Sequence, residues 1–304
     1  MSMRSKMVNV MEENWDFLIV LDACRYDYFS EVYRDFFDGK LEKIISVGCS
    51  TVEWLKRSFT DYYSDVIYIS ANPYINSKVG IEGFYAKRHF YRVVDVWDFG
   101  WDNELGTVPP REVNKAALKQ YLKHPEKRFI IHYLQPHAPY LSDKFRQKGY
   151  EKLNPEDGQV LSSITGYKRV NRHFESMINV AGTLLSKLNI VESSWALREK
   201  IGLPPISPMD VVRRKYGRNG LIEAYKENLK IVLYYVAKMC KRFSEKRIVI
   251  TSDHGELLGE EGTYEHPNGP IDKIFNNLFP KRKKILQEVP WLKVEVCVDA
   301  HPYR

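Results

Sequence analysis

The apolar positions of the chain gather into short runs that end in polar residues. The first run covers residues 15–22 (WDFLIVLD), and the same pattern recurs at 65–71, 128–135 and 247–253. Continuous apolar runs, unlike alternating ones, are typical of strands buried on both faces of a parallel sheet. We therefore predict four inner strands whose carboxyl ends place polar residues along one rim of the sheet, where open α/β sheets bind their ligands.

Segments with helical spacing of apolar residues separate these runs. The spacing predicts helices over residues 27–37, 52–59, 111–122 and 221–243. A last apolar run, residues 291–298, predicts a strand that closes one edge of the sheet. Because strands and helices alternate along the chain, the predicted fold class is layered α/β.

Residues 143–220 interrupt this alternation. The segment is basic, lacks strand-like runs and contains the loop-forming prolines Pro204, Pro205 and Pro208. We interpret it as a helical insertion or cap on a single domain that covers residues 1–304.

Composition limits the class of partner. The chain has 46 Lys and Arg against 39 Asp and Glu, a formal net charge of +7, which would attract an anionic substrate. Its densest basic run, residues 281–284, has no interleaved aromatic residues of the kind that track a nucleic-acid backbone. We therefore expect a small anionic ligand and no nucleic acid, while the oligomeric state stays open.

Cysteine usage and the amino terminus bear on the compartment. The four cysteines, Cys24, Cys49, Cys240 and Cys297, show no CxxC spacing, so neither a zinc knuckle nor a disulfide framework is expected. Residues 1–14 lack the apolar core of a signal peptide, and no stretch reaches the ~18 apolar residues that span a membrane. We expect a cytoplasmic protein without a membrane span.

An acid and an imidazole stand side by side at the end of one predicted strand. Asp253 and His254 are followed by Gly255, which lets the chain bend so that both side chains can face one ion. Asp22 ends another predicted strand, where a buried carboxylate needs a cation. The mixed oxygen and nitrogen donors favour zinc or manganese. An Asp–His hydrogen bond at a turn is the structural alternative.

Three ordered motifs resemble one protein family. Asp22 is followed by Arg25 and Asp27, the middle of the chain carries HYLQPHAPY at 132–140, and SDHGE lies at 252–256. Together they resemble the alkaline phosphatase superfamily, and within it the sulfatase-like branch and the phosphoethanolamine and phosphoglycerol transferases. The resemblance extends roughly over residues 15–298, apart from 143–220. It implies a three-layer α/β/α sandwich with a mostly parallel central sheet and a helical insertion.

The resemblance implies a nucleophile that also binds the metal, at the start of the helix after the second strand. Thr51 occupies that position, although capping of the helix is its alternative role. Cys49 is a rival because sulfatases of this family convert a cysteine to formylglycine, but the Cys-x-Pro-x-Arg pattern is absent. Ser50 is a second rival. The implied metal ligands are Asp22, Thr51, Asp253 and His254.

Further residues are implied to contact the substrate. His137 resembles the family's substrate-binding histidine, and His266 occupies the corresponding late position; either can donate to a non-bridging oxygen or protonate the leaving group. Asn72 and Arg25 are further substrate-binding candidates, although for Arg25 a pair with Asp27 that fixes the turn is favoured. His132, inside a predicted strand, is interpreted as a core residue.

The chain departs from the family at two places. Calcium-binding sulfatases carry two adjacent acids after the first strand, whereas Ala23 follows Asp22 here. Two-metal members place an Asp shortly before the middle histidine, where this chain has Gln135 and Pro136. We therefore expect one divalent metal, zinc or manganese, with calcium or magnesium as alternatives.

These residues predict a metal-dependent hydrolase of phosphate or sulfate esters that acts through a covalent intermediate on Thr51. A head-group transferase of the same superfamily is one alternative. Such transferases usually carry membrane helices and none is expected here, so hydrolysis is favoured. A non-catalytic protein whose metal organises a binding surface is the other alternative. The substrate stays open.

Overall fold

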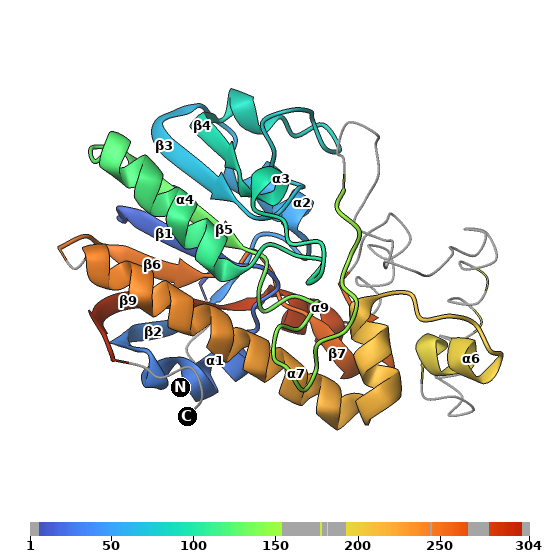
Figure 1. The fold of residues 1–304 in the computed structure, drawn as a ribbon. Helices are drawn as coiled ribbons and strands as arrows, with labels where there is room; N and C mark the ends of the chain where they lie inside the picture. Colours follow the sequence, from blue (N-terminus) through green and yellow to red (C-terminus); the bar gives the residue numbers. More distant parts are fainter. Residues whose placement is uncertain are drawn as a thin grey trace.

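The structure is a computed structural model that describes residues 6–153, 193–243, 245–266 and 280–299, together with Met177 and Ala181. Its centre is a seven-stranded sheet (Figure 1). In chain order the strands are β1 (Phe17–Leu21), β2 (Phe37–Ile45), β3 (Tyr63–Ser70), β4 (Phe90–Asp95), β5 (Arg128–Tyr133), β6 (Ile248–Thr251) and β9 (Glu288–Cys297). Across the sheet their order is β2-β9-β6-β1-β5-β3-β4. A separate ribbon pairs β7 (Leu257–Glu260) with β8 (Thr263–Glu265).

The sheet is mostly parallel, as the sequence predicts. Within the described sheet β9 alone runs antiparallel to the strands on either side of it, and the other neighbours are parallel. The predicted strands at 15–22, 65–71, 128–135 and 247–253 correspond to β1, β3, β5 and β6. The layered α/β fold class is therefore confirmed.

Two predictions about the edges of the sheet are wrong. The run at 291–298 does not close an edge, because β9 lies between β6 and β2. The edge strands are β2 and β4, which the sequence does not predict, and the predicted helix over 27–37 overlaps the first residue of β2. An edge strand has one open side and accepts charged residues, so its sequence lacks a continuous apolar run. In β2 more buried and more exposed positions alternate accordingly.

The helices are α1 (Tyr26–Val32), α2 (Thr51–Ser58), α3 (Val96–Phe99), α4 (Pro110–Lys123), α6 (Ser194–Lys200), α7 (Pro208–Cys240) and α9 (Pro280–Gln287). The long helix α7 begins well before the predicted 221, and it changes direction at Gly217, whose φ of 70° is a left-handed conformation that glycine adopts readily. Of the predicted insertion at 143–220, residues 154–192 lie outside the described residues apart from Met177 and Ala181, and the insertion stays a prediction. None of the described helices has both the length and the apolar character needed to cross a bilayer.

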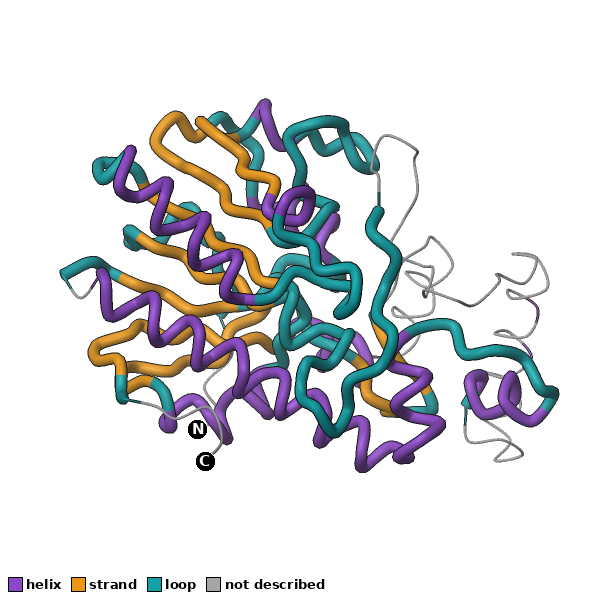
Figure 2. The backbone as a smooth tube through the Cα atoms, in the orientation of Figure 1, coloured by secondary structure: helices purple, strands orange, loops and turns teal. Residues whose placement is uncertain are grey.

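Alternate side chains of the inner strands pack in two layers. On β1, Phe17, Ile19 and Leu21 share a core with α1, α4 and α7, and Figures 1 and 2 show α4 and α7 side by side across this face of the sheet. Leu18 and Val20 point to the opposite face, where they pack with α2. Burial on both faces explains why β1 is apolar throughout, and polar residues emerge only where the strand ends.

Candidate active site

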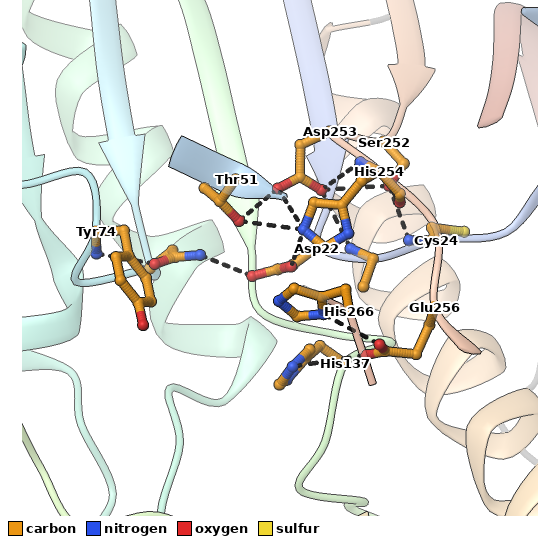
Figure 3. Close-up of polar contacts among 12 residues, drawn as sticks. Asp22, Cys24, Thr51, Tyr74, His137, Ser252, Asp253, His254, Glu256 and His266 are labelled. Atoms are coloured by element: carbon orange, nitrogen blue, oxygen red, sulfur yellow. Dashed lines mark hydrogen bonds and ion pairs between the residues drawn. The ribbon is translucent and has the colours of Figure 1, made fainter. Parts of the chain in front are cut away.

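Four predicted residues converge at the carboxyl rim of the sheet. Asp22 directly follows β1, Asp253 and His254 follow β6, and Thr51 is the first residue of α2. Because β1 and β6 are parallel neighbours, their carboxyl ends lie next to each other. Figure 3 shows the four side chains pointing toward one another.

The distances place these side chains within reach of one ion. Thr51 Oγ1 donates a hydrogen bond of 2.7 Å to Asp253 Oδ2 and lies 3.3 Å from His254 Nε2. His254 Nε2 lies 3.4 Å from Asp253 Oδ2 and 3.7 Å from Asp22 Oδ1. One ligand atom from each of Asp22, Asp253 and His254 lies within 4.8 Å of the others. The three side chains therefore form a group that can hold a metal ion.

The backbone around His254 fixes which ring nitrogen faces the group. Nδ1 lies 2.8 Å from the carbonyl oxygen of Gly255. A carbonyl oxygen accepts a hydrogen bond but cannot donate one, so Nδ1 carries the proton of the neutral ring. The lone pair of Nε2 then points at Thr51 and the two carboxylates. This tautomer is the one that a metal-binding histidine needs.

The turn after β1 is attached to the turn after β6. Ala23, with a φ of 57°, donates its backbone N–H to Asp253 Oδ1 at 3.1 Å. The next N–H, of Cys24, is donated to the Ser252 hydroxyl at 2.8 Å. These bonds set the distance between Asp22 and Asp253, because the residue after Asp22 bonds to Asp253 itself and the next one bonds to Ser252, which precedes Asp253.

Asp22 is a buried acid whose surroundings oppose its ionisation. Burial, followed by the nearby charges of Asp253 and Glu256, raises the pKa of Asp22 well above its usual range. Its Oδ2 accepts a hydrogen bond of 2.7 Å from Asn72 Nδ2, whereas its buried Oδ1 has no hydrogen-bond partner in the part of the chain that the structure describes. A cation beside Oδ1 would satisfy that oxygen and stabilise the ionised form.

Asp253 is in a different electrostatic position from Asp22. Burial opposes its ionisation, but the neighbouring His254 and His132 and the hydrogen bond from Thr51 outweigh burial and hold the pKa of Asp253 below its usual value. We therefore take Asp253 as the ionised member of the pair and Asp22 as the one whose charge depends on a bound cation.

The local structure separates the capping role of Thr51 from a catalytic one. The N-cap of α2 is Ser50, and Thr51 directs its hydroxyl at Asp253 and His254 instead of at the helix backbone. The Cys49 side chain packs with Leu257 and Leu286, and burial raises the pKa of its thiol to about 11. Of the three candidates, Thr51 is the residue whose hydroxyl lies among the predicted metal ligands.

A second group of side chains lies beside the first. Glu256 Oε1 lies 3.0 Å from His266 Nδ1, and Glu256 Oε2 lies 3.6 Å from His137 Nε2. The rings of His254 and His266 are 4.3 Å apart between centroids, so the two groups are adjacent (Figure 3). Glu256 belongs to the SDHGE motif, but the sequence alone does not assign it to the site. Its position depends on the β7–β8 ribbon, which brings His266 back to Glu256.

In this second group, one oxygen of Glu256 and one ring nitrogen of His137 face each other without a hydrogen between them. Burial raises the pKa of Glu256 to about 7 and lowers the pKa of His266 to about 4; burial also lowers the pKa of His137. His137 Nδ1 lies 2.7 Å from the carbonyl oxygen of Ala138, so its Nε2 lone pair faces the carboxylate. Glu256 Oε2 is buried, with no hydrogen-bond partner among the described residues. A proton or a cation between Glu256 and His137 would satisfy both atoms.

The two other predicted substrate-binding residues already have protein partners. Asn72 holds Asp22 through its amide, as described above. Arg25 donates to Asp27 Oδ2 at 2.6 Å, to Glu260 Oε1 at 2.7 Å and to the Glu256 carbonyl oxygen at 3.2 Å. These bonds favour the structural role of Arg25, in which it fixes the turn after β1 against the ribbon.

The long helix α7 contacts both loops that carry candidate site residues. The Tyr225 hydroxyl donates to the Ala23 carbonyl oxygen at 2.7 Å, after β1. Asn228 Nδ2 lies 3.1 Å from the carbonyl oxygens of Pro136 and His137, after β5. The positions of Asp22 and His137 are therefore both set from the same helix.

Comparisons with known proteins give structural likenesses only. No known protein family and no curated protein matches the sequence. The fold is similar to the soluble domain of lipooligosaccharide phosphoethanolamine transferase A from Neisseria meningitidis, with a TM-score of 0.45 and 14% identity over 96% of this chain and 77% of that chain. It is also similar to the phosphonate monoester hydrolase of Agrobacterium radiobacter, with a TM-score of 0.46 and 12% identity over 92% and 67%. A protein in the alkaline phosphatase superfamily from Vibrio parahaemolyticus has a TM-score of 0.44 and 9% identity over 94% and 61%.

Proposed function

We propose that the protein is a metal-dependent hydrolase of phosphate or sulfate esters that forms a covalent intermediate on Thr51. The observation that carries this proposal is the position of the Thr51 hydroxyl, 2.7 Å from Asp253 Oδ2 and 3.3 Å from His254 Nε2, at the amino end of α2. A hydroxyl placed there can attack an ester whose anionic oxygens lie against the positive end of the helix.

Asp22, Asp253 and His254 would hold the metal, with Thr51 beside it. The buried Asp22 Oδ1, which lacks a hydrogen-bond partner within the described ranges, and the unprotonated His254 Nε2 both fit a cation. This mixed donor set suits zinc or manganese, whereas calcium and magnesium prefer oxygen throughout. A bound metal lowers the pKa of the hydroxyl and offsets negative charge on the ester oxygens.

In the proposed reaction, which has two steps, Thr51 and the histidines have different roles. Thr51 Oγ1 gives its proton to Asp253 Oδ2, which already accepts its hydrogen bond, and forms a bond to phosphorus or sulfur while the bond to the leaving oxygen breaks. The leaving oxygen receives a proton from His137 or His266, which share it with Glu256. In the second step water attacks the ester on Thr51 and gives a proton back to the histidine–glutamate group, while the bond to Thr51 Oγ1 breaks. Phosphate or sulfate leaves, and Thr51 regains its proton from Asp253.

Metal analysis and an ester panel test this proposal. The purified protein is expected to bind zinc or manganese stoichiometrically and to hydrolyse at least one of an aryl phosphate monoester, an aryl phosphate diester and an aryl sulfate. Acid quenching during turnover should leave a mass increase on the peptide that contains Thr51. Cys49→Ala and Ser50→Ala serve as matched controls and should retain turnover. Full activity in Thr51→Ala would contradict the proposal.

Two other functions remain distinguishable in the same assays. A head-group transferase would yield a modified acceptor alcohol in place of free phosphate or sulfate. A non-catalytic protein would bind the metal without a covalent ester on Thr51. The hydroxyl among the carboxylates favours a catalytic role over the second alternative, because a purely organising metal site has no need of a nucleophile.

A further inference from the structure

His132 lies beside the candidate metal site, near the Asp253 oxygen that accepts the Thr51 hydrogen bond. It is a fully buried residue of β5, the strand that pairs with β1. Its Nδ1 is 2.8 Å from the Tyr68 hydroxyl of β3, and its Nε2 is 3.9 Å from Asp253 Oδ2. The Trp54 ring packs edge-on against the imidazole. His132 therefore joins the core of the sheet to one carboxylate of the site.

The surroundings of His132 decide which of its nitrogens carries the proton. Among the described residues the Tyr68 hydroxyl has one hydrogen-bond partner, His132 Nδ1. If that hydroxyl accepted from Nδ1, its own buried hydrogen would lack an acceptor, so the phenol donates its hydrogen to Nδ1. The single ring proton then lies on Nε2, directed at Asp253.

No acceptor for the His132 Nε2–H lies within hydrogen-bond distance in the part of the chain described. The nitrogen is buried and lacks a hydrogen-bond partner there, and a buried N–H without an acceptor is costly. A separation of 3.9 Å is too long for a hydrogen bond, but a movement of about 0.7 Å would bring it within range. Asp253 Oδ2 is the acceptor in that direction.

We propose that His132 is a positioning residue, which receives the Tyr68 hydrogen bond at Nδ1 and directs its Nε2–H at Asp253 to fix the orientation of that carboxylate. This inference rests on the proposed function for its consequence, because Asp253 is there a metal ligand. Groups that orient metal ligands from behind typically change metal affinity 10- to 100-fold when they are removed. The core role predicted for His132 from its strand position would not change metal affinity selectively.

Two isosteric variants separate positioning from packing. A glutamine amide at 132 places its N–H near the position of Nε2, whereas an asparagine amide reaches only the position of Nδ1. His132→Asn should weaken zinc binding, measured by calorimetry and by competition with a chromophoric chelator, by about 10- to 100-fold. His132→Gln should restore affinity toward the wild type. Thermal unfolding of both metal-free variants reports the shared packing change.

The ring tautomer provides a test that needs neither metal nor a folded variant. Long-range ¹H–¹⁵N spectra of the metal-free wild type should show His132 as the Nε2–H tautomer, and an Nδ1–H tautomer would overturn the inference. Equal loss of zinc affinity in the Asn and Gln variants would also overturn it, since packing alone would then explain the effect. A wild-type protein that shows the Nε2–H tautomer but binds no metal would instead contradict the proposed function. His132 would in that case still orient the Asp253 carboxylate.

Discussion

Thr51 Oγ1 lies 2.7 Å from Asp253 Oδ2, although 202 residues separate the two in the sequence. The contact forms because the segment that leads from β2 into α2 is attached to the end of β6. The Ser46 hydroxyl donates a hydrogen bond to the Asp253 carbonyl oxygen. The loop before α2 is therefore attached to the same residue, Asp253, that Thr51 contacts at the start of the helix. Thr51 thus reaches the acid from one side while the backbone holds it from the other.

Replacement of Thr51 should remove turnover without unfolding the protein. Thr51→Ala is expected to lower kcat/KM by about 10³-fold or more, because the nucleophile is lost. It should cost only about 1 kcal/mol of stability, since one buried hydrogen bond disappears and Ser50 remains the N-cap. Thr51→Ser keeps the hydroxyl and should retain part of the rate. Steady-state kinetics and urea unfolding measure the two effects, and a large loss of stability with unchanged kinetics would contradict this reading.

Substitution of Asp22 should have opposite effects with and without metal. Asp22→Asn keeps an acceptor for Asn72 and removes a carboxyl group that burial and the nearby acids force to take up a proton, so the metal-free variant should unfold at a higher temperature than the metal-free wild type. Zinc at a hundredfold excess over Kd should stabilise the wild type by about 2.7 kcal/mol and the variant much less. Differential scanning calorimetry with zinc and with a chelator gives all four values. Equal zinc stabilisation of both proteins would exclude Asp22 as a ligand.

Glu256 should make the metal-free protein less stable as pH rises. Burial raises the folded pKa of Glu256 from 4.5 to about 7, so its stabilising protonated form is fully present below pH 4.5 and is lost as pH rises through about 7. At 1.36 kcal/mol per pKa unit the loss is about 3 kcal/mol. Glu256→Gln should therefore gain stability relative to the wild type between pH 5 and pH 8.

The difference between these two proteins reports Glu256 together with its effect on His137 and His254, whose pKa values the glutamate charge raises. Burial lowers the pKa values of His132 and His266, so their contribution falls as pH drops toward 4, but it is present in both proteins. Urea unfolding of both metal-free proteins at several pH values measures the difference. A difference that does not change with pH would show that Glu256 is ionised throughout.

Arg25 should affect stability more than substrate binding. Lysine cannot reproduce the forked contact with Asp27 and Glu260, so Arg25→Lys is expected to cost about 2 kcal/mol, reduced from a fully buried pair because both acids are partly exposed. KM for the preferred ester should stay unchanged. A rise in KM with no change in unfolding free energy would instead support the substrate-binding role that the sequence also allows.

The sequence predicts those site residues that stand next to the ends of buried strands. Asp22, Asp253 and His254 are recognisable because an apolar run makes a terminal acid costly unless a cation meets it. Glu256 cannot be assigned in the same way, since its pairing with His266 requires the β7–β8 ribbon to fold back. The prediction of a single metal rests on Gln135 and Pro136, which stand where two-metal members have an Asp. It takes no account of Glu256, whose carboxylate lies beside His137 although it follows a different strand.

The limits on the fold prediction have a related physical cause. Inner strands such as β1 and β5 are recognisable because both faces are buried, whereas β2 and β4 lie at the edges and carry charged residues. The position of β9 depends on pairing with β2, and an apolar run does not specify which strands will flank it. His132 is hidden for the opposite reason: inside an apolar strand, a histidine looks like any other core residue.

Tyr225 and Asn228 stand one helical turn apart, and that spacing links two loops that are distant in sequence. An extra residue between them would rotate one side chain by about 100° around the axis of α7 and detach either the Ala23 carbonyl or the proline-flanked loop of His137. The inner side of this helix should therefore accept conservative replacements but no change of length. The spacing of Tyr225 and Asn228 on α7 thus fixes the distance between the two loops. Natural variants of the chain should keep the number of residues between these two positions, even where the outer surface of α7 differs in sequence.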